Sequence, residues 1–330
     1  MISIAEWSQE ESEDADIRQI TMLCKAAGDP VRMQILRALQ NNSFGVLELC
    51  EVFGIQQPAL SHHLKILAKA SLVAFRRAGT SIFYRRNDIN PNPGLRQLQN
   101  ALFTFLDSNS INNDYATTLA KIHSKRSNVS LEFFNKNVHK FEENQDLIAG
   151  WSDYGPSIEG FMPTSGNRGS ALDVGAGYGN FIKILASTFD TVVALDNSQE
   201  MLAKCKNEVE AQNIDNVEFI LGDTKKVLES EHHYDFISLN MVLHHNLTPS
   251  DLVNDCAKVL HNKGTLLVTE LCDHDQRWVR NTCGDTWLGI EPNALTKWAV
   301  DAGLEENASL YLSMRNGFRI QIRRFSLKQP

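Results

Sequence analysis

One stretch of the sequence, residues 171–181, constrains the fold of this chain more than any other. It reads Ala-Leu-Asp-Val-Gly-Ala-Gly-Tyr-Gly-Asn-Phe, so that a short apolar run ends at Val174, three alternating glycines follow, and an amphipathic segment begins at Phe181. Because glycine lacks a Cβ, the backbone can turn sharply after a strand and a ligand can approach it closely. The stretch predicts a strand, a turn and a helix that cradle a nucleotide-type ligand, although a plain strand-to-helix turn has the same pattern.

Length and composition indicate a globular protein of two domains. The chain has 330 residues, of which 42% are hydrophobic and 22% charged, as in ordinary folded proteins. The sequence has no apolar run of the roughly 20 residues that cross a bilayer, and its acidic amino end is unlike a signal peptide. The six cysteines show no close spacing. We therefore expect reduced thiols in the cytoplasm, without a disulfide framework or a metal cluster.

The charge is distributed unevenly along the chain. Residues 1–17 carry six acids and no base, whereas residues 18–87 carry ten lysines and arginines against three acids. The chain as a whole has a net charge of −8. A basic segment inside an acidic protein is typical of a nucleic-acid-binding module, although a solvated basic face has the same composition.

The amino-terminal third predicts a series of short helices. Residues 1–16 are polar and acidic and predict a flexible tail. Apolar spacing predicts a helix that ends at Ala27, after which Asp29 caps a second helix with Pro30 at its first position. A third short helix is expected at residues 46–53.

The next helix, at residues 57–69, has two different faces. Leu60, Leu64 and Leu67 form an apolar stripe that must face the core. The opposite face is polar and suited to hydrogen bonds with base edges and phosphates in a major groove. His63 lies beside the stripe, where we expect it to pack. From this helix, the residues that we expect to contact DNA are Gln56, Gln57, Ser61, His62 and Lys65.

Two apolar and aromatic segments, at residues 72–77 and 81–86, flank a glycine turn and predict a β-hairpin. Four arginines lie on the hairpin, and we expect these arginines, Arg76 and Arg77 in particular, to face solvent and hold DNA phosphates. A recognition helix followed by a basic hairpin is a winged helix-turn-helix. These elements predict a DNA-binding domain at residues 17–90.

Residues 18–87 resemble the ArsR/SmtB family of bacterial repressors, through Gly-Asp-Pro-Val-Arg at residues 28–32 and Leu-Ser-His-His-Leu-Lys at residues 60–65. The resemblance implies a homodimer that binds an operator in double-stranded DNA. Many members sense metals through a Cys-Val-Cys box, and the matching positions here are Gly45, Val46 and Leu47. Both thiolate ligands are missing, so a purely metal-responsive repressor conflicts with the sequence, and we expect no metal site.

Residues 91–129 are expected to connect two domains. A hinge with two prolines at residues 88–94 precedes an amphipathic helix that begins at Leu95. This helix either completes a dimer interface, as in the family that the first domain resembles, or packs within one subunit. In the helical region that follows, Phe134 and Phe141 are candidates for a lid over a ligand, with core packing as the alternative.

From residue 170 onward strand and helix alternate, which is typical of a doubly wound sheet. Asp173, Asp196 and Asp223 stand at the carboxyl ends of three expected strands, where such folds bind their ligands. A helix cap is the alternative role of each acid. Asp196 is suited to a ribose and Asp223 to an adenine amine. We expect strands near residues 171–175, 191–196, 217–221, 234–240 and 265–271, and a closing hairpin with a turn at residues 316–317.

The region from residue 130 to 330 resembles class I S-adenosylmethionine-dependent methyltransferases, through Asp-Val-Gly-Ala-Gly-Tyr-Gly at residues 173–179 and through the acids at strand ends. The resemblance implies a Rossmann-like α/β fold whose seven-stranded sheet has an antiparallel last strand, and S-adenosylmethionine or S-adenosylhomocysteine as the ligand. A nicotinamide-dependent enzyme is the alternative. The expected cofactor-binding residues are Asp173, Gly175, Ala176, Gly177, Asp196, Asn197, Gly222, Asp223 and Asn240.

Three histidines are candidates for catalysis. His244 and His245 follow the fourth expected strand, and His274 follows the fifth. An imidazole titrates near neutral pH and can act as a general base. Pocket lining without catalysis is the alternative role for these side chains.

Two functions remain open from the sequence. The fusion resembles S-adenosylhomocysteine-responsive regulators of bacterial methionine metabolism, which implies a dimeric transcription factor that senses the cofactor or its product. The alternative is an active methyltransferase that acts on a small molecule and carries an attached DNA-binding domain.

Overall fold

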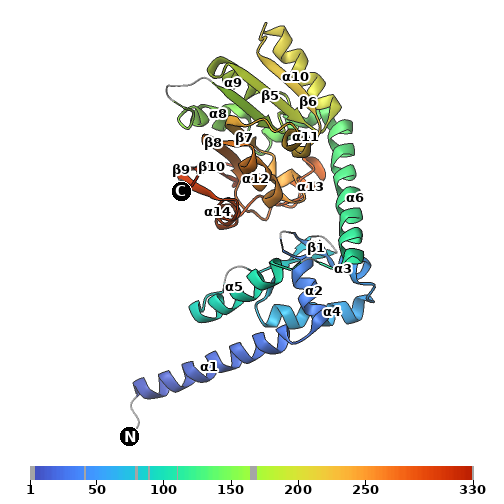
Figure 1. The fold of residues 1–330 in the computed structure, drawn as a ribbon, viewed down its shortest axis with the longest axis vertical. Helices are drawn as coiled ribbons and strands as arrows, with labels where there is room; N and C mark the ends of the chain where they lie inside the picture. Colours follow the sequence, from blue (N-terminus) through green and yellow to red (C-terminus); the bar gives the residue numbers. More distant parts are fainter. Residues whose placement is uncertain are drawn as a thin grey trace. The chain divides into compact units, whose positions relative to one another are not determined.

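The computed structural model describes residues 4–40, 42–78, 81–87, 90–109, 111–163 and 169–328. The chain divides into two units, Met1–Lys125 and Arg126–Pro330 (Figure 1). The point of division lies inside one long helix, α6 (Asn113–Asn137).

The first unit contains the winged helix-turn-helix fold that the sequence predicts. Its small sheet has the strand order β1-β3-β2, and both of its strand pairs are antiparallel. The strands are β1 (Phe44–Gly45), β2 (Val73–Ala78) and β3 (Ser81–Arg86). The helices are α1 (Ile4–Ala27), α2 (Pro30–Ala38), α3 (Val46–Phe53), α4 (Gln57–Lys69) and α5 (Pro93–Asp107), followed by the first half of α6.

Short-range chemistry sets the ends of these helices. The side chain of Asp29 accepts a hydrogen bond of 2.9 Å from the backbone N–H of Arg32, and Pro30 occupies the first turn of α2. Gly54 ends α3 with a φ of 63°, a left-handed conformation that glycine adopts without cost. These boundaries confirm the predicted ones.

The core of the first unit forms around the leucine stripe of α4. Leu60, Leu64 and Leu67 are fully buried, together with Ile35 of α2 and Leu49 of α3. Each buried leucine or isoleucine contributes about 1.5–3 kcal/mol through the hydrophobic effect. The stripe therefore fixes which face of α4 remains exposed.

The amino-terminal helix is longer than the sequence predicts. We expected a flexible tail at residues 1–16, whereas α1 begins at Ile4. The tail contains strong helix formers and several glutamates, and acidic residues are favourable near the positive end of a helix dipole. The helix therefore extends through the acidic segment.

One arginine of the hairpin has a structural role and does not face solvent. Arg86 is 4% exposed, and its guanidinium donates two hydrogen bonds to the carboxylate of Asp107, at 3.0 and 2.7 Å. It also donates to the carbonyl of Leu36 and lies 4.6 Å from the ring centroid of Phe103. The expectation that all four hairpin arginines lie on the surface for phosphates is therefore wrong for Arg86.

The second unit is built on a seven-stranded sheet with the order β6-β5-β4-β7-β8-β10-β9. Its pairs are parallel up to β8, and β10 runs antiparallel to both of its neighbours. This topology confirms the expected class, a Rossmann-like methyltransferase fold. The strands are β4 (Ser170–Val174), β5 (Thr191–Asp196), β6 (Val217–Leu221), β7 (Tyr234–Asn240), β8 (Leu260–Leu271), β9 (Leu304–Ser313) and β10 (Arg319–Leu327).

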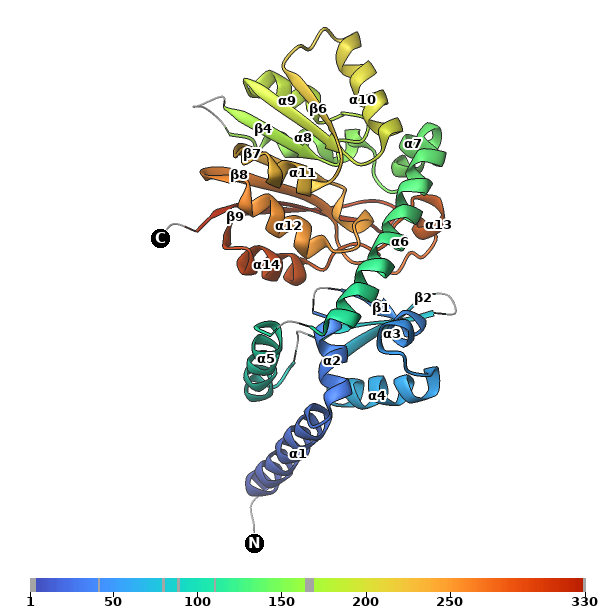
Figure 2. The same ribbon diagram turned by 45° about the vertical axis from the view of Figure 1, so that its right-hand side comes forward.

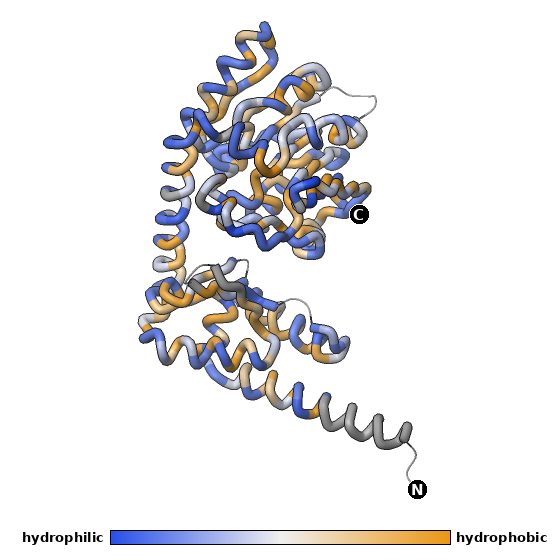
Figure 3. The backbone as a smooth tube through the Cα atoms, turned by 180° about the vertical axis from the view of Figure 1, so that it is seen from behind, coloured by the Kyte–Doolittle hydropathy of each residue, from blue (hydrophilic) through white to orange (hydrophobic). Residues whose placement is uncertain are grey.

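Helices cover both faces of this sheet (Figure 2). One face packs against α8 (Trp151–Glu159), α9 (Ile182–Thr188) and α10 (Gln199–Ala211). The other packs against α11 (Thr224–Glu229), α12 (Pro249–Lys258) and α14 (Pro292–Asp301). Because both faces are buried, the central strands are almost continuously apolar. Figure 3 shows the hydropathy of the backbone along both units. The remaining elements are η1 (Val138–Lys140), α7 (Phe141–Asp146), η2 (Leu243–His245) and α13 (Val279–Thr282).

In the described part of the chain, every helix is too short or too polar to cross a bilayer.

The structural role of Arg86 predicts a loss of stability when it is replaced. Arg86→Met leaves the carboxylate of Asp107 and the carbonyl of Leu36 without their donor. We expect the free energy of unfolding to fall by about 2 kcal/mol, less than for a fully buried ion pair because Asp107 is partly exposed. Chemical denaturation measures this change, with Arg85→Met of the same strand as the control. Equal losses for the two variants would contradict the assignment.

Candidate functional site

The glycine turn after β4 lies where the parallel strands reach their carboxyl ends, which we call the ligand-facing edge of the sheet, and it leaves an open space there. Gly175 and Gly177 have φ values of 73° and 54°, which favour glycine. A Cβ on Gly175 would lie 2.5 Å from a methyl carbon of Val242, so a side chain does not fit there. A Cβ on Gly177 would meet only the carbonyl oxygen of Gly175, at 4.0 Å. The space beside Gly177 is therefore open to a ligand.

Asp196 joins this turn to the end of β5. One carboxylate oxygen accepts a hydrogen bond of 3.0 Å from the N–H of Gly177, and the other accepts one of 2.8 Å from the N–H of Ser198. Asp196 is 9% exposed, and burial raises its pKa, against the opposing effect of these backbone donors. The two oxygens of a carboxylate offer about four acceptor positions, so two remain for the hydroxyls of a ligand.

Asp173 lies deeper at the same edge. It is 2% exposed, and the hydroxyl of Ser238 donates a hydrogen bond of 2.6 Å to its Oδ1. Burial raises the pKa of Asp173 to about 7; the Ser238 hydrogen bond opposes this rise, and the charge of Asp196 adds to it. Asp173 is therefore close to half protonated near neutral pH.

The remaining predicted residues follow the neighbouring strands. The N–H of Gly222 donates a hydrogen bond of 2.9 Å to the carbonyl oxygen of Asp196. Asn240 is partly buried at the end of β7, and its Oδ1 has no hydrogen-bond partner in the described part of the chain. Such an orphaned buried acceptor fits a ligand that supplies a donor.

Asp223 and Asn197 lie further out than the other predicted residues. Asp223 is exposed and caps α11, and its Oδ1 accepts a hydrogen bond of 3.0 Å from the N–H of Lys225. The alternative role of a helix cap is therefore present at Asp223. Asn197 is also exposed. Asp173 and Asp196 are thus buried, whereas Asp223 and Asn197 are exposed to solvent.

Helix α6 reaches this edge with its last turns. The hydroxyl of Ser198 donates a hydrogen bond of 2.7 Å to the side-chain oxygen of Asn135. The ring of Phe134 packs edge-on against that of His245, with centroids 4.9 Å apart. Of the two lid candidates, Phe134 therefore lies beside the predicted site, whereas the side chain of Phe141 lies outside the described residues.

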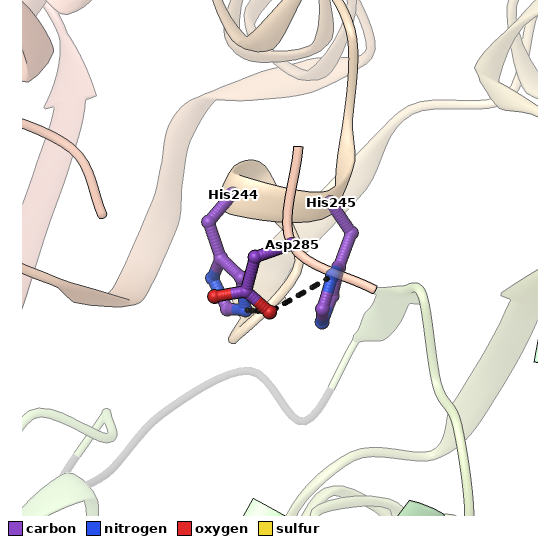
Figure 4. Close-up of side chains that lie close together, drawn as sticks. All are labelled: His244, His245 and Asp285. Carbon is purple, nitrogen blue, oxygen red and sulfur yellow. Dashed lines mark ion pairs between the residues drawn. The ribbon is translucent and has the colours of Figure 1, made fainter. Parts of the chain in front are cut away.

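Two of the catalytic candidates form a buried cluster with acids. His244 and His245 lie together on η2, and the carboxylate of Asp285 points toward both (Figure 4). Asp285 Oδ1 lies 4.0 Å from His244 Nε2 and 3.8 Å from His245 Nδ1. His244 Nδ1 pairs with the carboxylate of Glu270. This carboxylate also accepts a hydrogen bond of 3.1 Å from the backbone N–H of His244. We refer to His244, His245 and Asp285 as the His–His–Asp cluster.

The two histidines have opposite protonation states, for different reasons. Burial by itself lowers the pKa of His244, but Glu270 and Asp285 together raise it to about 9. The pKa of His245 is lowered well below its usual value by burial and by the charge of His244. At neutral pH, His244 is therefore charged and His245 neutral.

The third candidate, His274, lies apart from this cluster. Its ring packs against Phe318, with centroids 4.8 Å apart, and in the described part of the chain no hydrogen bond or ion pair joins it to His244 or His245. Burial lowers the pKa of His274 to about 4, and the charge of His244 adds to this effect.

Sequence reasoning missed Glu270 as a member of the site, and it gave Asp285 no role of its own within a polar segment after the fifth strand that could line a substrate pocket. Glu270 is fully buried in β8, and Asp285 is 4% exposed in the segment after α13. An acid within the apolar run Leu-Leu-Val-Thr-Glu-Leu at residues 266–271 was a usable signal for Glu270. Asp285 lies among several polar residues, and nothing in its spacing marks it.

In the first unit, the predicted DNA-contacting face of α4 is accessible. His63 is half-buried, and its Nδ1 lies 3.7 Å from Asp29, in agreement with the expected packing role. The backbone of Arg76 and Arg77 lies in β2, but their side chains lie outside the described residues. All the residues of α4 and its cap that we expect to contact DNA are exposed, namely Gln56, Gln57, Ser61, His62 and Lys65.

Comparison with known proteins assigns a family model to each unit. A model described as "Bacterial regulatory protein, arsR family" matches residues 29–74, and one described as "Methyltransferase domain" matches residues 172–268. An uncharacterized HTH-type transcriptional regulator of Methanocaldococcus jannaschii is 46% identical over 61 residues, which cover 18% of this chain and 68% of that protein. The transcriptional repressor SdpR of Bacillus subtilis is 38% identical over 63 residues, which cover 19% of this chain and 70% of that protein.

Solved structures resemble the second unit in fold. The 1,6-didemethyltoxoflavin-N1-methyltransferase of Burkholderia thailandensis, whose structure contains S-adenosylhomocysteine, has a TM-score of 0.50 and 15% identity. The match covers 63% of this chain and 91% of that chain. At this identity the likeness shows the fold alone.

The raised pKa of Asp173 predicts a pH-dependent effect of its replacement. The unfolded chain releases the proton of Asp173 near pH 4, whereas the folded chain releases it near pH 7. The contribution of Asp173 to the free energy of unfolding therefore falls as the pH rises from the first value to the second. We expect Asp173→Asn to gain unfolding free energy relative to the wild type as the pH rises from 5 to 8, measured by chemical denaturation. The exposed Asp190→Asn serves as the control. A difference between Asp173→Asn and the wild type that does not change with pH would refute the assignment.

Proposed function

The chain belongs to the arsR family of bacterial regulatory proteins and carries a methyltransferase domain, and on that basis we propose that it is a transcriptional regulator controlled by a ligand of this domain. The proposed ligand is S-adenosylmethionine or its demethylated product S-adenosylhomocysteine. The proposed physiological role is control of the bacterial methyl cycle.

The buried carboxylate of Asp196 is the observation that carries the proposal. Asp196 is held by the N–H of Gly177 and the N–H of Ser198, next to the open side of the glycine turn. The two hydroxyls of a ribose placed there would donate charge-assisted hydrogen bonds to this one pre-oriented acceptor. The orphaned oxygen of Asn240 supplies a further acceptor for a polar group of the ligand.

The proposed partner is an operator in double-stranded DNA. Ser61, His62 and Lys65 are exposed on α4, where they can approach base edges and phosphates. Arg76 and Arg77 remain the proposed phosphate contacts of the hairpin.

We also propose that the chain acts as a homodimer. Helices α1 and α5 expose large apolar side chains, with Ile17 62%, Ile20 42%, Leu98 37% and Phe105 67% exposed. Contiguous exposed apolar residues favour association, and two-fold symmetry matches two half-sites about 34 Å apart on DNA. The ligand must then bind one dimer geometry better than the other, because equal affinity shifts no equilibrium.

A second candidate function is methyl transfer to a small molecule. It is favoured by His245, which stays neutral at pH 7 while it lies beside the charged His244. A neutral imidazole can accept the acceptor's proton while the methyl group passes from the sulfonium to the acceptor and leaves S-adenosylhomocysteine. Labelled methyl groups that appear in products from a metabolite extract, and no longer appear with His245→Gln, would favour this function.

Reciprocal variants test the proposal. Asp196→Ala removes the ribose acceptor, and we expect the affinity for S-adenosylhomocysteine to fall at least about tenfold, since hydrogen bonds to a charged group contribute about 1.5–3 kcal/mol each. Its affinity for a DNA duplex selected by the chain from random sequences should be unchanged. Lys65→Ala should weaken DNA binding and leave the affinity for S-adenosylhomocysteine unchanged. It should also reduce the salt slope of DNA binding by about one.

Calorimetry for the ligand and fluorescence anisotropy for DNA measure both affinities. Asp190→Ala, at the opposite end of β5, is the matched control for Asp196. Lys206→Ala, on the exposed surface of α10, is the matched control for Lys65. Normal ligand binding by Asp196→Ala would overturn the site assignment.

A further inference from the structure

We propose that the His–His–Asp cluster is a binding site for a divalent transition-metal ion, of which Zn²⁺ is the best-suited probe. The sequence predicts no metal site, because the cysteine box of the first domain is missing. The proposed site lies elsewhere, in the second unit, and it does not depend on the function proposed above.

The positions of the three side chains fit a single ion. One ligand atom from each residue can be chosen so that all three lie within 4.8 Å of one another. Bonds of about 2.0–2.1 Å from nitrogen and oxygen to one Zn²⁺ separate its ligand atoms by roughly 3.4 Å in a tetrahedron. The observed separations of 3.8 and 4.0 Å from Asp285 exceed this by a few tenths of an ångström. The separation of the two histidine nitrogens is bounded only by the 4.8 Å of the whole set, so an inward movement of the side chains is needed to complete the coordination.

The present contacts of Asp285 do not satisfy a buried carboxylate. Asp285 is 4% exposed, and neither of its oxygens has a hydrogen-bond partner in the described part of the chain. The Nε2 atom of the fully buried His244 has none either. The facing ring nitrogens of His244 and His245 are too far from Asp285 for hydrogen bonds. A buried acceptor left in this state is costly, and an ion between these atoms removes the cost.

Glu270 orients His244 as a ligand. Its carboxylate pairs with Nδ1 of His244 and also accepts hydrogen bonds from the N–H of His244, at 3.1 Å, and of Leu271, at 2.6 Å. When an ion displaces the proton of Nε2, the proton that Nδ1 shares with Glu270 stays in place and the lone pair of Nε2 becomes available to the ion. A metal-binding histidine usually donates its other ring N–H to a carboxylate, which fixes the tautomer of the ring and raises the basicity of the nitrogen that binds the metal.

Charge also favours a cation at this position. Glu270 and Asp285 bring two carboxylates into one buried cluster, where a protonated His244 is shared between them and the guanidinium of Arg280 acts on Asp285. A divalent ion neutralises both, with His244 and His245 as neutral ligands. Two imidazoles select a transition metal such as Zn²⁺ over Mg²⁺ or Ca²⁺, which prefer oxygen ligands. Three protein ligands leave a fourth position open for water or for an oxygen of a bound molecule.

Metal binding to the full chain tests the inference. Protein treated with a chelator is dialysed against Zn²⁺ in excess Mg²⁺, and the bound metal is measured by elemental analysis. We expect one Zn²⁺ per chain. Asp285→Asn and His245→Gln should each lower the affinity at least about 100-fold. Asp275→Asn and His261→Gln, which alter an exposed acid and an exposed histidine, should bind as the wild type does.

Co²⁺ provides a second, spectroscopic readout. Intense visible absorption bands are expected when Co²⁺ replaces Zn²⁺ in the wild type, and they should disappear in His245→Gln, which decides the question if Asp285→Asn fails to fold. A wild type that binds no stoichiometric Zn²⁺, or ligand variants that bind it normally, would overturn the inference. Binding of S-adenosylhomocysteine measured on the same samples separates this failure from failure of the proposed function.

Discussion

The hydrogen bonds of Asp196 determine how the ligand-facing edge of the second unit is built. This single carboxylate joins the glycine turn of β4 to the start of α10, through the N–H groups of Gly177 and Ser198. The backbone of Asp196 also receives the N–H of Gly222 from the end of β6. Three neighbouring strands therefore meet at one residue. Ser198 extends the connection to Asn135 in the last turns of α6.

The local features of both units were predictable because neighbouring residues determine them. Asp29 and Pro30 begin α2 by capping chemistry, and the leucines of α4 mark its buried face by helical spacing. In the second unit, the strand, the glycine turn and the acid at the next strand end lie together as expected, at the edge where we propose that the ligand binds. The methyltransferase topology, including the antiparallel β10, followed from the resemblance to a known family and agrees with the structure.

Contacts between distant residues were not predictable in this way. Arg86 appeared to be one of four surface arginines, yet it pairs with Asp107, which lies 21 residues further along the chain. His244 pairs with Glu270, 26 residues away, and faces Asp285 across a larger separation in sequence. Spacing rules report on helices, strands and turns, but they contain no information about which loops meet. For the same reason the histidines were recognised as candidates, whereas their acidic partners were missed.

A DNA-binding domain and a cofactor site in one chain have a regulatory meaning only if each affects the other. By linkage, a ligand that changes the affinity for DNA must have its own affinity changed by DNA to the same extent. The most direct test is the affinity of the wild-type chain for its selected duplex with and without saturating S-adenosylhomocysteine. The account predicts a change of at least about fivefold, which corresponds to the lower range of known couplings. The same affinity in both conditions would contradict it.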